Sequence, residues 1–178
     1  MKDRPGTSRV VHPRLGPLVV GPVAPARTYA LRHGVLRPHQ EVAEMGVAGE
    51  EGPTAATVGA VTAEGAVVST GCVVEGPPPG GLAGVVPAGR PFRLRAMATR
   101  PDARRSGVGA AVLAALVDHV AAEDGAVLWC NARLGAVPFY EQAGFVRHGE
   151  VWEEPMIGPH VVMWRPVTPR AAHPEGGR

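Results

Sequence analysis

One short segment combines two arginines with two glycines one residue apart: Arg104, Arg105, Ser106, Gly107, Val108, Gly109 and Ala110. It follows a strand-like run over 92–99 and opens a clear helix. Glycines there let a ligand approach the backbone. The first turn of a helix also leaves N–H groups without intrahelical acceptors, at the end where the helix dipole favours negative charge. We therefore expect a phosphate or pyrophosphate at this segment, with charge-assisted hydrogen bonds from the arginines.

Two other glycine-rich loops fit this segment poorly. A nucleoside-triphosphate loop needs a lysine directly after its last glycine, and the only lysine of the chain is Lys2. A dinucleotide-binding loop needs a third glycine where this chain has Val112, and an acidic residue after the next strand. Glu123 and Asp124 instead stand at the end of a helix.

A third pattern, Arg/Gln-x-x-Gly-x-Gly/Ala, matches Arg104, Gly107 and Gly109. Downstream, after a second strand-like run, Tyr140 and the pair 144–145 match a Tyr-x-x-x-Gly-Phe signature. Together the two segments resemble the GNAT superfamily of N-acetyltransferases, over roughly residues 27–166. The resemblance implies that acetyl-coenzyme A (acetyl-CoA) is the cosubstrate and that its pyrophosphate binds at the 104–110 segment.

The resemblance also implies roles for four residues around the thioester. In the family, backbone groups at Met97, Ala98 and Thr99 hydrogen-bond the pantetheine arm and hold the acetyl carbonyl, which needs backbone donors beside the thioester oxygen. Tyr140 matches the tyrosine that protonates the departing sulfur. A neutral phenol can supply that proton, because the leaving thiolate has an ordinary pKa of about 8.5. A place in the core beside neighbouring phenylalanines is the alternative for Tyr140.

Asn131 follows an apolar strand and could bind the pantetheine or cap the next helix. Many family members carry asparagine seven positions before the tyrosine, where this chain has Arg133. That departure puts one usual cofactor contact in doubt.

The acceptor side is less defined. The stretch 153–163 looks like the C-terminal strand of some bacterial family members, in which acidic and histidine side chains face the acceptor. An amine with a pKa near 10 must lose a proton before it attacks, at a cost of about 4 kcal/mol at pH 7. Glu75, Glu154 and His160 are the candidate proton acceptors, and we select His160 with Tyr140 as the catalytic pair.

The sequence thus predicts an enzyme that moves an acetyl group directly to a primary amine of a small molecule or peptide. A non-catalytic acyl-CoA-binding module is the alternative, since it would keep both glycines and not need Tyr140. Cys72 and Cys130 read as buried apolar residues in preference to a disulfide or a catalytic thiol. The acceptor's identity and the oligomeric state, a homodimer included, stay open.

Composition excludes other classes. The net charge of the 178 residues is +2 and basic runs interleaved with aromatics are absent, so we expect no nucleic acid as partner. The N-terminus has no apolar signal segment, and the longest apolar run, 110–117, is too short to span a membrane. A cytoplasmic protein without membrane contact is the default. Histidine spacing predicts no metal.

The elements that must position these residues alternate along the chain. Apolar spacing predicts a helix over 107–123 and a buried parallel strand over 126–130. A glycine- and proline-rich loop, 76–91, is either a lid or simply flexible. The remaining expected elements are an edge strand around 18–20, a helix over 27–37, strands over 54–61 and 67–74, a helix over 136–143, and strands over 145–152 and 160–165.

This order predicts one α/β domain over 14–167, between flexible tails at 1–13 and 168–178. Its sheet is mixed, with helices on both faces. The family resemblance adds that the sheet is twisted and splayed open between the strands around Met97 and Leu128, with the cofactor in the splay.

Overall fold

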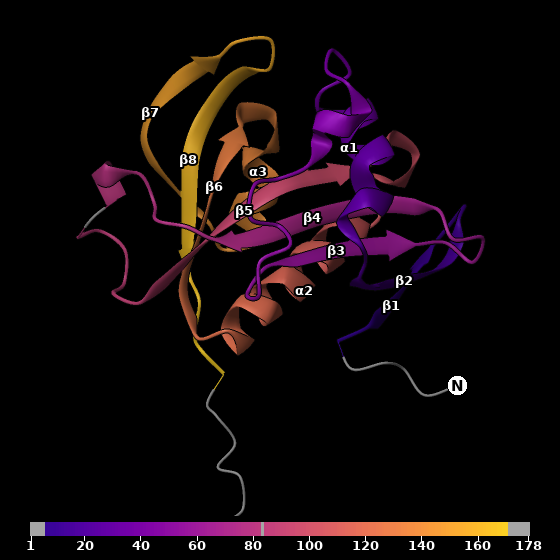
Figure 1. The fold of residues 1–178 in the computed structure, drawn as a ribbon, viewed down its shortest axis with the longest axis horizontal. Helices are drawn as coiled ribbons and strands as arrows, with labels where there is room; N and C mark the ends of the chain where they lie inside the picture. The colour runs from indigo at the N-terminus through magenta and orange to yellow at the C-terminus, as the bar shows by residue number, and fades with distance from the viewer. Residues whose placement is uncertain (1–5, 83, 171–178) are drawn as a thin grey trace, which may run out of the picture.

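The computed structural model describes residues 6–82 and 84–170 of the chain. A mixed eight-stranded sheet runs through it in the order β1-β2-β3-β4-β5-β6-β8-β7 (Figure 1), which confirms the predicted α/β class. The strands are β1 (Ser8–His12), β2 (Gly16–Pro22), β3 (Ala56–Val61), β4 (Val67–Glu75), β5 (Arg90–Thr99), β6 (Gly125–Arg133), β7 (Val146–Glu154) and β8 (Gly158–Pro166).

Helices cover both faces of this sheet, as predicted. The long helix α2 (Val108–Ala122) packs along one face, and α3 (Val137–Gln142) lies beside its first turn. The helix α1 (Tyr29–Leu36) packs on β4 and β5 from the opposite face (Figure 1). Short 3₁₀ turns connect the elements: η1 (Pro25–Thr28), η2 (Val42–Met45), η3 (Gly80–Leu82), η4 (Pro101–Ala103) and η5 (Leu134–Ala136). Among the described residues, no helix is long and apolar enough to cross a bilayer.

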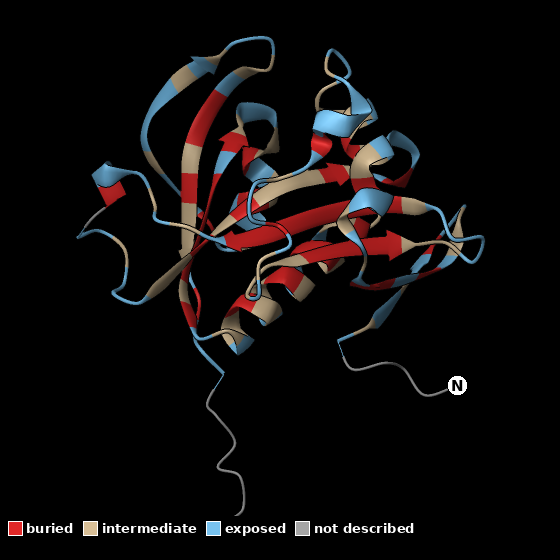
Figure 2. Cartoon of the chain, in the orientation of Figure 1, coloured by how far each residue is buried: buried red, intermediate tan, exposed pale blue. Residues whose placement is uncertain are grey.

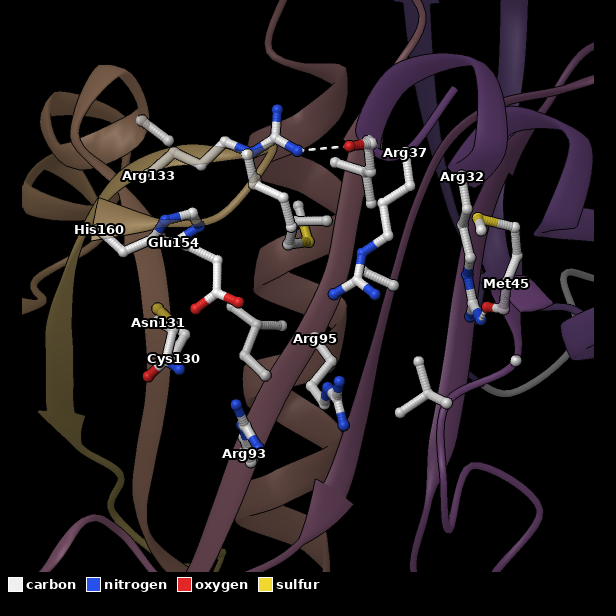
Figure 3. A pocket seen from close by; sticks show the side chains of 18 of the residues that line it. Arg32, Arg37, Met45, Arg93, Arg95, Cys130, Asn131, Arg133, Glu154 and His160 are labelled. Carbon is white, nitrogen blue, oxygen red and sulfur yellow. Dashed lines mark hydrogen bonds between the residues drawn. The ribbon is translucent and has the colours of Figure 1, made fainter. Parts of the chain in front are cut away.

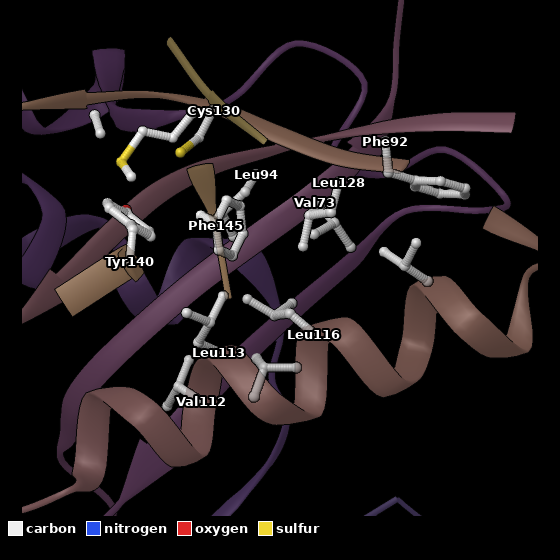
Figure 4. Packing of buried hydrophobic residues seen from close by; sticks show 14 of the residues in the cluster. Val73, Phe92, Leu94, Val112, Leu113, Leu116, Leu128, Cys130, Tyr140 and Phe145 are labelled. Carbon is white, nitrogen blue, oxygen red and sulfur yellow. The ribbon is translucent and has the colours of Figure 1, made fainter. Parts of the chain in front are cut away.

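The core lies between α2 and the sheet. The buried stripe of α2 faces apolar side chains of β4, β5 and β6, and the rings of Phe145 and Tyr140 belong to the same cluster (Figures 2 and 4). Valine and leucine make up most of this core, as the low aromatic content predicts. The stripe itself consists of Val108, Val112, Leu113, Leu116 and Val120.

The only parallel pair in the sheet is β5 with β6, and α2 is the crossover between them. Their pairing is short: the segment Arg90–Arg93 lies opposite the segment Gly125–Trp129 and no further pairs follow. Beyond Arg93, β5 stays with β4, whereas β6 continues with β8 as far as the pair of Arg133 with His160. The predicted splay of the sheet is therefore confirmed, and it opens toward the end of β5.

The N-terminal prediction was wrong. Within the segment expected to be a tail, β1 pairs with β2, so β2 is an inner strand and not an edge strand. The buried ring of His12 explains the turn, because its Nδ1 accepts the amides of Arg14 and Leu15 at 3.1 and 3.0 Å. That cap stabilises a hairpin which the prolines and polar residues of 1–13 do not suggest.

The other end agrees better with expectation. After β8 the chain has no regular structure over 168–170, although the amide of Arg170 bonds the carbonyl of Ala121 at 2.9 Å. The rest of the predicted C-terminal tail, 171–178, lies outside the described residues.

Candidate active site

The segment from η4 to α2 presents backbone N–H groups, as its sequence predicts. Gly107 is the N-cap of α2 and has a φ of +82°, a conformation that glycine adopts without strain. No side chain caps the helix, so the amides of Val108, Gly109 and Ala110 are the first-turn donors without an intrahelical acceptor. The hydroxyl of Ser106 instead donates to the carbonyl of Ala103 at 2.7 Å.

Gly109 is needed for a second reason. A Cβ at this position would lie 3.1 Å from Oγ1 of Thr99, which is tighter than ordinary contact. The hydroxyl of Thr99 is fixed by a hydrogen bond of 2.8 Å with that of Ser69. Gly109 therefore lets the first turn of α2 lie close against the end of β5, so the loop between them stays tight.

The two loop arginines differ. The Nε of Arg104 donates to the carbonyl of Thr99 at 3.1 Å, which folds this side chain back onto the end of β5. Arg105 is exposed and has a φ of +59°. Arg104 thus stabilises the loop through its Nε, and both guanidinium groups are exposed beside the N-terminus of α2.

A cavity of about 360 Å³ opens where β5 and β6 diverge (Figure 3). A bulge in β5 shapes its floor: Thr70 pairs with Ala98 and Cys72 with Arg95, and Ala96 between them has a φ of +53°. The lining side chains come from α1 and its C-terminal loop, from β5 and β6, from α3, and from the β7–β8 hairpin. They include Arg37, Met45, Arg95, Met97, Asn131, Tyr140, Glu154 and His160.

Tyr140 reaches this cavity from α3 with a buried ring (Figure 4). Phe139 and Phe145 hold the ring at centroid distances of 5.1 and 5.4 Å. Burial raises the pKa of the phenol well above its usual value of 10.0. Both interpretations of this tyrosine are therefore met: it is a core aromatic, and it presents a neutral phenol to the cavity.

His160 enters from β8, on the wall opposite β5 (Figure 3). Its Nδ1 lies 2.7 Å from the carbonyl of Gly158, which only accepts, so Nδ1 donates this hydrogen bond, and the neutral form of the ring is the Nδ1–H tautomer. The indole of Trp152 packs against the imidazole at 5.8 Å and donates to Glu154 at 3.3 Å. This tautomer leaves Nε2 as the basic nitrogen.

The comparisons with known proteins agree on one family. The family model described as an acetyltransferase (GNAT) domain matches residues 78–163. The uncharacterized N-acetyltransferase YitI of Bacillus subtilis (strain 168) is 30% identical over 146 residues, which cover 78% of this chain and 89% of that protein. The chain belongs to the GNAT family. It is an acyltransferase that uses acyl-CoA as donor.

Solved GNAT structures show the same fold at low identity. A phosphinothricin acetyltransferase from Sinorhizobium meliloti, in complex with acetyl-CoA, aligns with a TM-score of 0.64 at 18% identity, over 88% of this chain and 91% of its own. An aminoglycoside 6'-N-acetyltransferase complexed with coenzyme A aligns with a TM-score of 0.64 at 14% identity, over 85% and 98%.

Two of the residues predicted to bind the cofactor line the cavity. Met97 and Asn131 both line the cavity, from the two strands that diverge. Asn131 caps no helix, because the N-caps of η5 and α3 are Arg133 and Ala136. Ala98 is buried in the pair with Thr70, so only its backbone can serve a ligand.

The departure from the GNAT pattern at Arg133 has a structural consequence. Its Nη2 donates to the carbonyl of Leu36 at 2.5 Å, which joins β6 to the C-terminus of α1 across the cavity (Figure 3). Burial lowers the pKa of this guanidinium, and the charge of Arg37 lowers it further. Arg133 thus forms part of the cavity wall in this GNAT enzyme.

Of the three candidate proton acceptors, Glu75 lies outside the cavity, so its prediction was wrong. Its carboxylate pairs with Arg90 at 2.7 Å, which lowers the pKa of the carboxyl, and it does not line the cavity. Glu154 and His160 do line it. The loop 76–91 is also not part of the lining: Leu82 is fully buried, and Trp129 donates to the carbonyl of Gly76 at 3.0 Å.

Sequence reasoning missed the basic character of the cavity. Five arginines line it: Arg32, Arg37, Arg93, Arg95 and Arg133. They come from three separate segments, so no local run announces them. The alternation of Arg93 and Arg95 in a strand was the available signal, because residues two apart share one face of the sheet.

Proposed function

We propose that this enzyme transfers an acetyl group from acetyl-CoA directly to a primary amine. The observation that carries the proposal is the meeting of Tyr140 and His160 at one cavity, which also holds the diverging ends of β5 and β6. A proton donor and a proton acceptor on separate walls are what aminolysis of a thioester requires.

The protein side fits the donor at two places. The amides of Val108, Gly109 and Ala110, with the guanidinium of Arg105, suit a diphosphate. Beyond Arg93, β5 has no strand on its β6 side, so alternate backbone groups of its last residues face the splay and can bond the pantetheine amides. The residues at this end of β5 are Met97, Ala98 and Thr99. Bound there, acetyl-CoA supplies an activated acyl group.

His160 is proposed as the proton acceptor for the amine. A protonated amine with a pKa near 10 is about 4 kcal/mol short of its reactive form at pH 7. Nε2 of His160 can take that proton, directly or through a water molecule, because Nδ1 already carries one for Gly158. The carboxylate of Glu154 beside it can hold the ammonium before deprotonation.

Tyr140 is proposed as the donor to sulfur. In the transfer, the amine nitrogen bonds the acyl carbon and then releases one proton to solvent, while the carbon–sulfur bond breaks with its electron pair leaving on sulfur. The phenol of Tyr140 gives this thiolate a proton and regains one from solvent. Its raised pKa keeps it in the neutral donor form.

The thiols of the chain support direct transfer in preference to an acetyl-enzyme. Burial raises the pKa of Cys130, which lines the cavity, to about 12, and that of Cys72 to about 11. A thiol reacts as its thiolate, which these two cysteines scarcely form near neutral pH.

The test is a donor and acceptor panel. Release of the coenzyme A thiol is followed with acetyl-, propionyl-, succinyl- and octanoyl-CoA against amines of varied charge, and acetylated product is identified by mass spectrometry. We expect acetyl-CoA to give the highest kcat/KM and the acetyl group to be found on nitrogen. A longer acyl donor that is preferred, or acyl-CoA binding without transfer to any amine, would overturn the proposal.

A further inference from the structure

The charges that line the acceptor side of the cavity are unbalanced. Five guanidinium groups face two carboxyl groups, those of Glu44 and Glu154. Only one guanidinium is neutralised by an ion pair: Arg32, fully buried, bonds the buried carboxylate of Glu50 at 2.7 Å. Arg133 is held by a neutral carbonyl. Four positive charges are therefore not neutralised, and three of them, those of Arg37, Arg93 and Arg95, also lack the strong anchoring bond that Arg133 makes.

These three have no carboxylate partner among the described residues. No ion pair within 6–82 and 84–170 includes any of them. Arg37 bonds the side chain of Gln40 at 3.3 Å, and Arg93 lies over the ring of Trp129 at 4.7 Å. The Nε of Arg93 is buried and has no hydrogen-bond partner. Donors of this kind are costly to leave unpaired.

Two of these guanidinium groups also repel one another. Arg93 and Arg95 are two residues apart on β5 and both line the cavity, which places two like charges on one face of a strand. Burial lowers the pKa of Arg93, and the charge of Arg95 lowers it further. An anion between them would remove this cost, since guanidinium groups bind carboxylate and phosphate through paired hydrogen bonds.

The two walls of the cavity differ in their chemical groups. Arg37 and Arg95 extend toward the same space from the end of α1 and from β5, whereas the carboxyl of Glu154 and the ring of His160 face it from the β7–β8 hairpin, with Arg133 as the strand partner of His160 (Figure 3). A molecule that spans the space meets guanidinium groups alone at one end, and at the other an acid–base pair whose neighbouring cation, Arg133, is bonded to Leu36. This arrangement disfavours acceptors with several positive charges.

We propose that the acceptor is a small amine that also carries a carboxylate or phosphate-type anion, with the amine at Glu154 and His160 and the anion at Arg37, Arg93 and Arg95. This inference rests on the proposed acetyl transfer and names its substrate class. It separates the arginines of the cavity from the 104–110 loop, which serves the diphosphate of the donor.

The first experiment varies only the anion. Amino acids are compared with their carboxamides, with the amines that decarboxylation yields, and with the matching aminoalkyl phosphonates. We expect kcat/KM for the acids or the phosphonates to exceed that for the neutral partners by about 10- to 100-fold, the range of a charge-assisted hydrogen-bond pair. Carboxylate and phosphonate series compared with one another identify the preferred anion.

The second experiment removes the cations. R37Q and R95Q should lower kcat/KM for anionic amines by about 10- to 100-fold through KM, with the KM for acetyl-CoA changed by less than about 2-fold. R147Q is the matched control, because Arg147 is exposed on β7 and pairs with Glu141 outside the cavity. The melting temperature of each variant in the presence of coenzyme A checks its folding.

Three outcomes overturn the inference. Neutral or polycationic amines are acetylated as well as anionic ones, or R37Q and R95Q act on the KM for acetyl-CoA alone, or both variants match R147Q. If no amine is acetylated, the proposed function fails separately. Stabilisation by glutarate in the presence of coenzyme A then decides the inference, since it must occur in the wild type and be lost in R95Q.

Discussion

The Nη2 of Arg133 donates a hydrogen bond of 2.5 Å to the carbonyl of Leu36, across 97 positions of sequence. The bond satisfies one of the last carbonyls of α1, which a helix leaves without intrahelical donors. It also closes one side of the cavity between two elements that share no strand pairing. The walls of this site are therefore fastened to each other by a side chain.

Replacing that side chain should loosen the acceptor wall. We expect R133M to lower the melting temperature by about 5 °C, because a hydrogen bond from a charged donor contributes about 1.5–3 kcal/mol. The KM for the acceptor should rise and the KM for acetyl-CoA should not. Thermal denaturation and steady-state kinetics measure both, with R147M as control. A rise confined to the KM for acetyl-CoA would mean that Arg133 contacts the donor instead.

Tyr140 predicts the alkaline behaviour of the enzyme. Y140F should lower kcat by about 100-fold or more without changing the affinity for acetyl-CoA, because it removes the proton donor and keeps the ring. Burial raises the pKa of the phenol, so in the wild type the neutral donor persists above pH 10. Ionisation of Tyr140 should therefore cause no fall of kcat up to pH 10. A fall below pH 10 that Y140F abolishes would contradict the raised pKa, and a kcat unchanged in Y140F would argue against the assignment.

The proposed role of His160 predicts a loss of activity on its replacement that depends on pH. H160Q should lower kcat/KM by about 100-fold at pH 7, and the loss should shrink as pH rises toward the pKa of the amine, about 10, where the acceptor deprotonates unaided. Rate profiles between pH 6 and 10 measure this. A loss that is the same at every pH would assign His160 a structural role through its contacts with Trp152 and Gly158.

The contact between Gly109 and Thr99 can be tested by a double-mutant cycle. G109A should destabilise the protein by about 1–3 kcal/mol and weaken binding of acetyl-CoA, since its Cβ would meet Oγ1 of Thr99 at 3.1 Å. In a T99A background that oxygen is gone, so the added cost of G109A should fall. Urea denaturation gives the stabilities. Additive effects would show that Gly109 is needed for the donor alone.

The pair of Arg32 and Glu50 gives a stability prediction. E50A should destabilise the fold by about 3–5 kcal/mol, because it leaves the buried guanidinium of Arg32 without a counter-charge. The double variant R32M/E50L should recover much of this loss. Glu50 also accepts bonds from Tyr29 and from the amide of Val47, so the loop after α1 should become sensitive to proteolysis in E50A. Equal stability of E50A and wild type would contradict this.

The parts of the fold that sequence predicted are those written in local patterns. The helix that begins at Gly107, the hairpin turn at Gly65 and the apolar strand after Gly125 each combine periodicity with a glycine of defined purpose. The left-handed residue of the β5 bulge could not be predicted from the sequence, because it is Ala96 and not glycine. Its conformation is imposed by pairing with β4.

Only part of the candidate site could be inferred from the sequence. Tyr140 and the loop glycines belong to two recognisable segments, so their positions followed from the family resemblance. The arginines did not: Arg37, Arg95 and Arg133 are brought together by α1 packing on β5 and by the end of β6. The place of β8 between β6 and β7 sets where His160 lies, and strand order of this kind has no local signal.

The short pairing between β5 and β6 has a consequence for how the range of substrates can change. Past Arg93 and Trp129 the two strands are no longer paired, so backbone spacing does not fix the width of the opening. Individual side chains line it, such as Arg133 and Arg95. Single substitutions at these positions can therefore retune the size and polarity of the molecule admitted while the ladder of the sheet stays untouched.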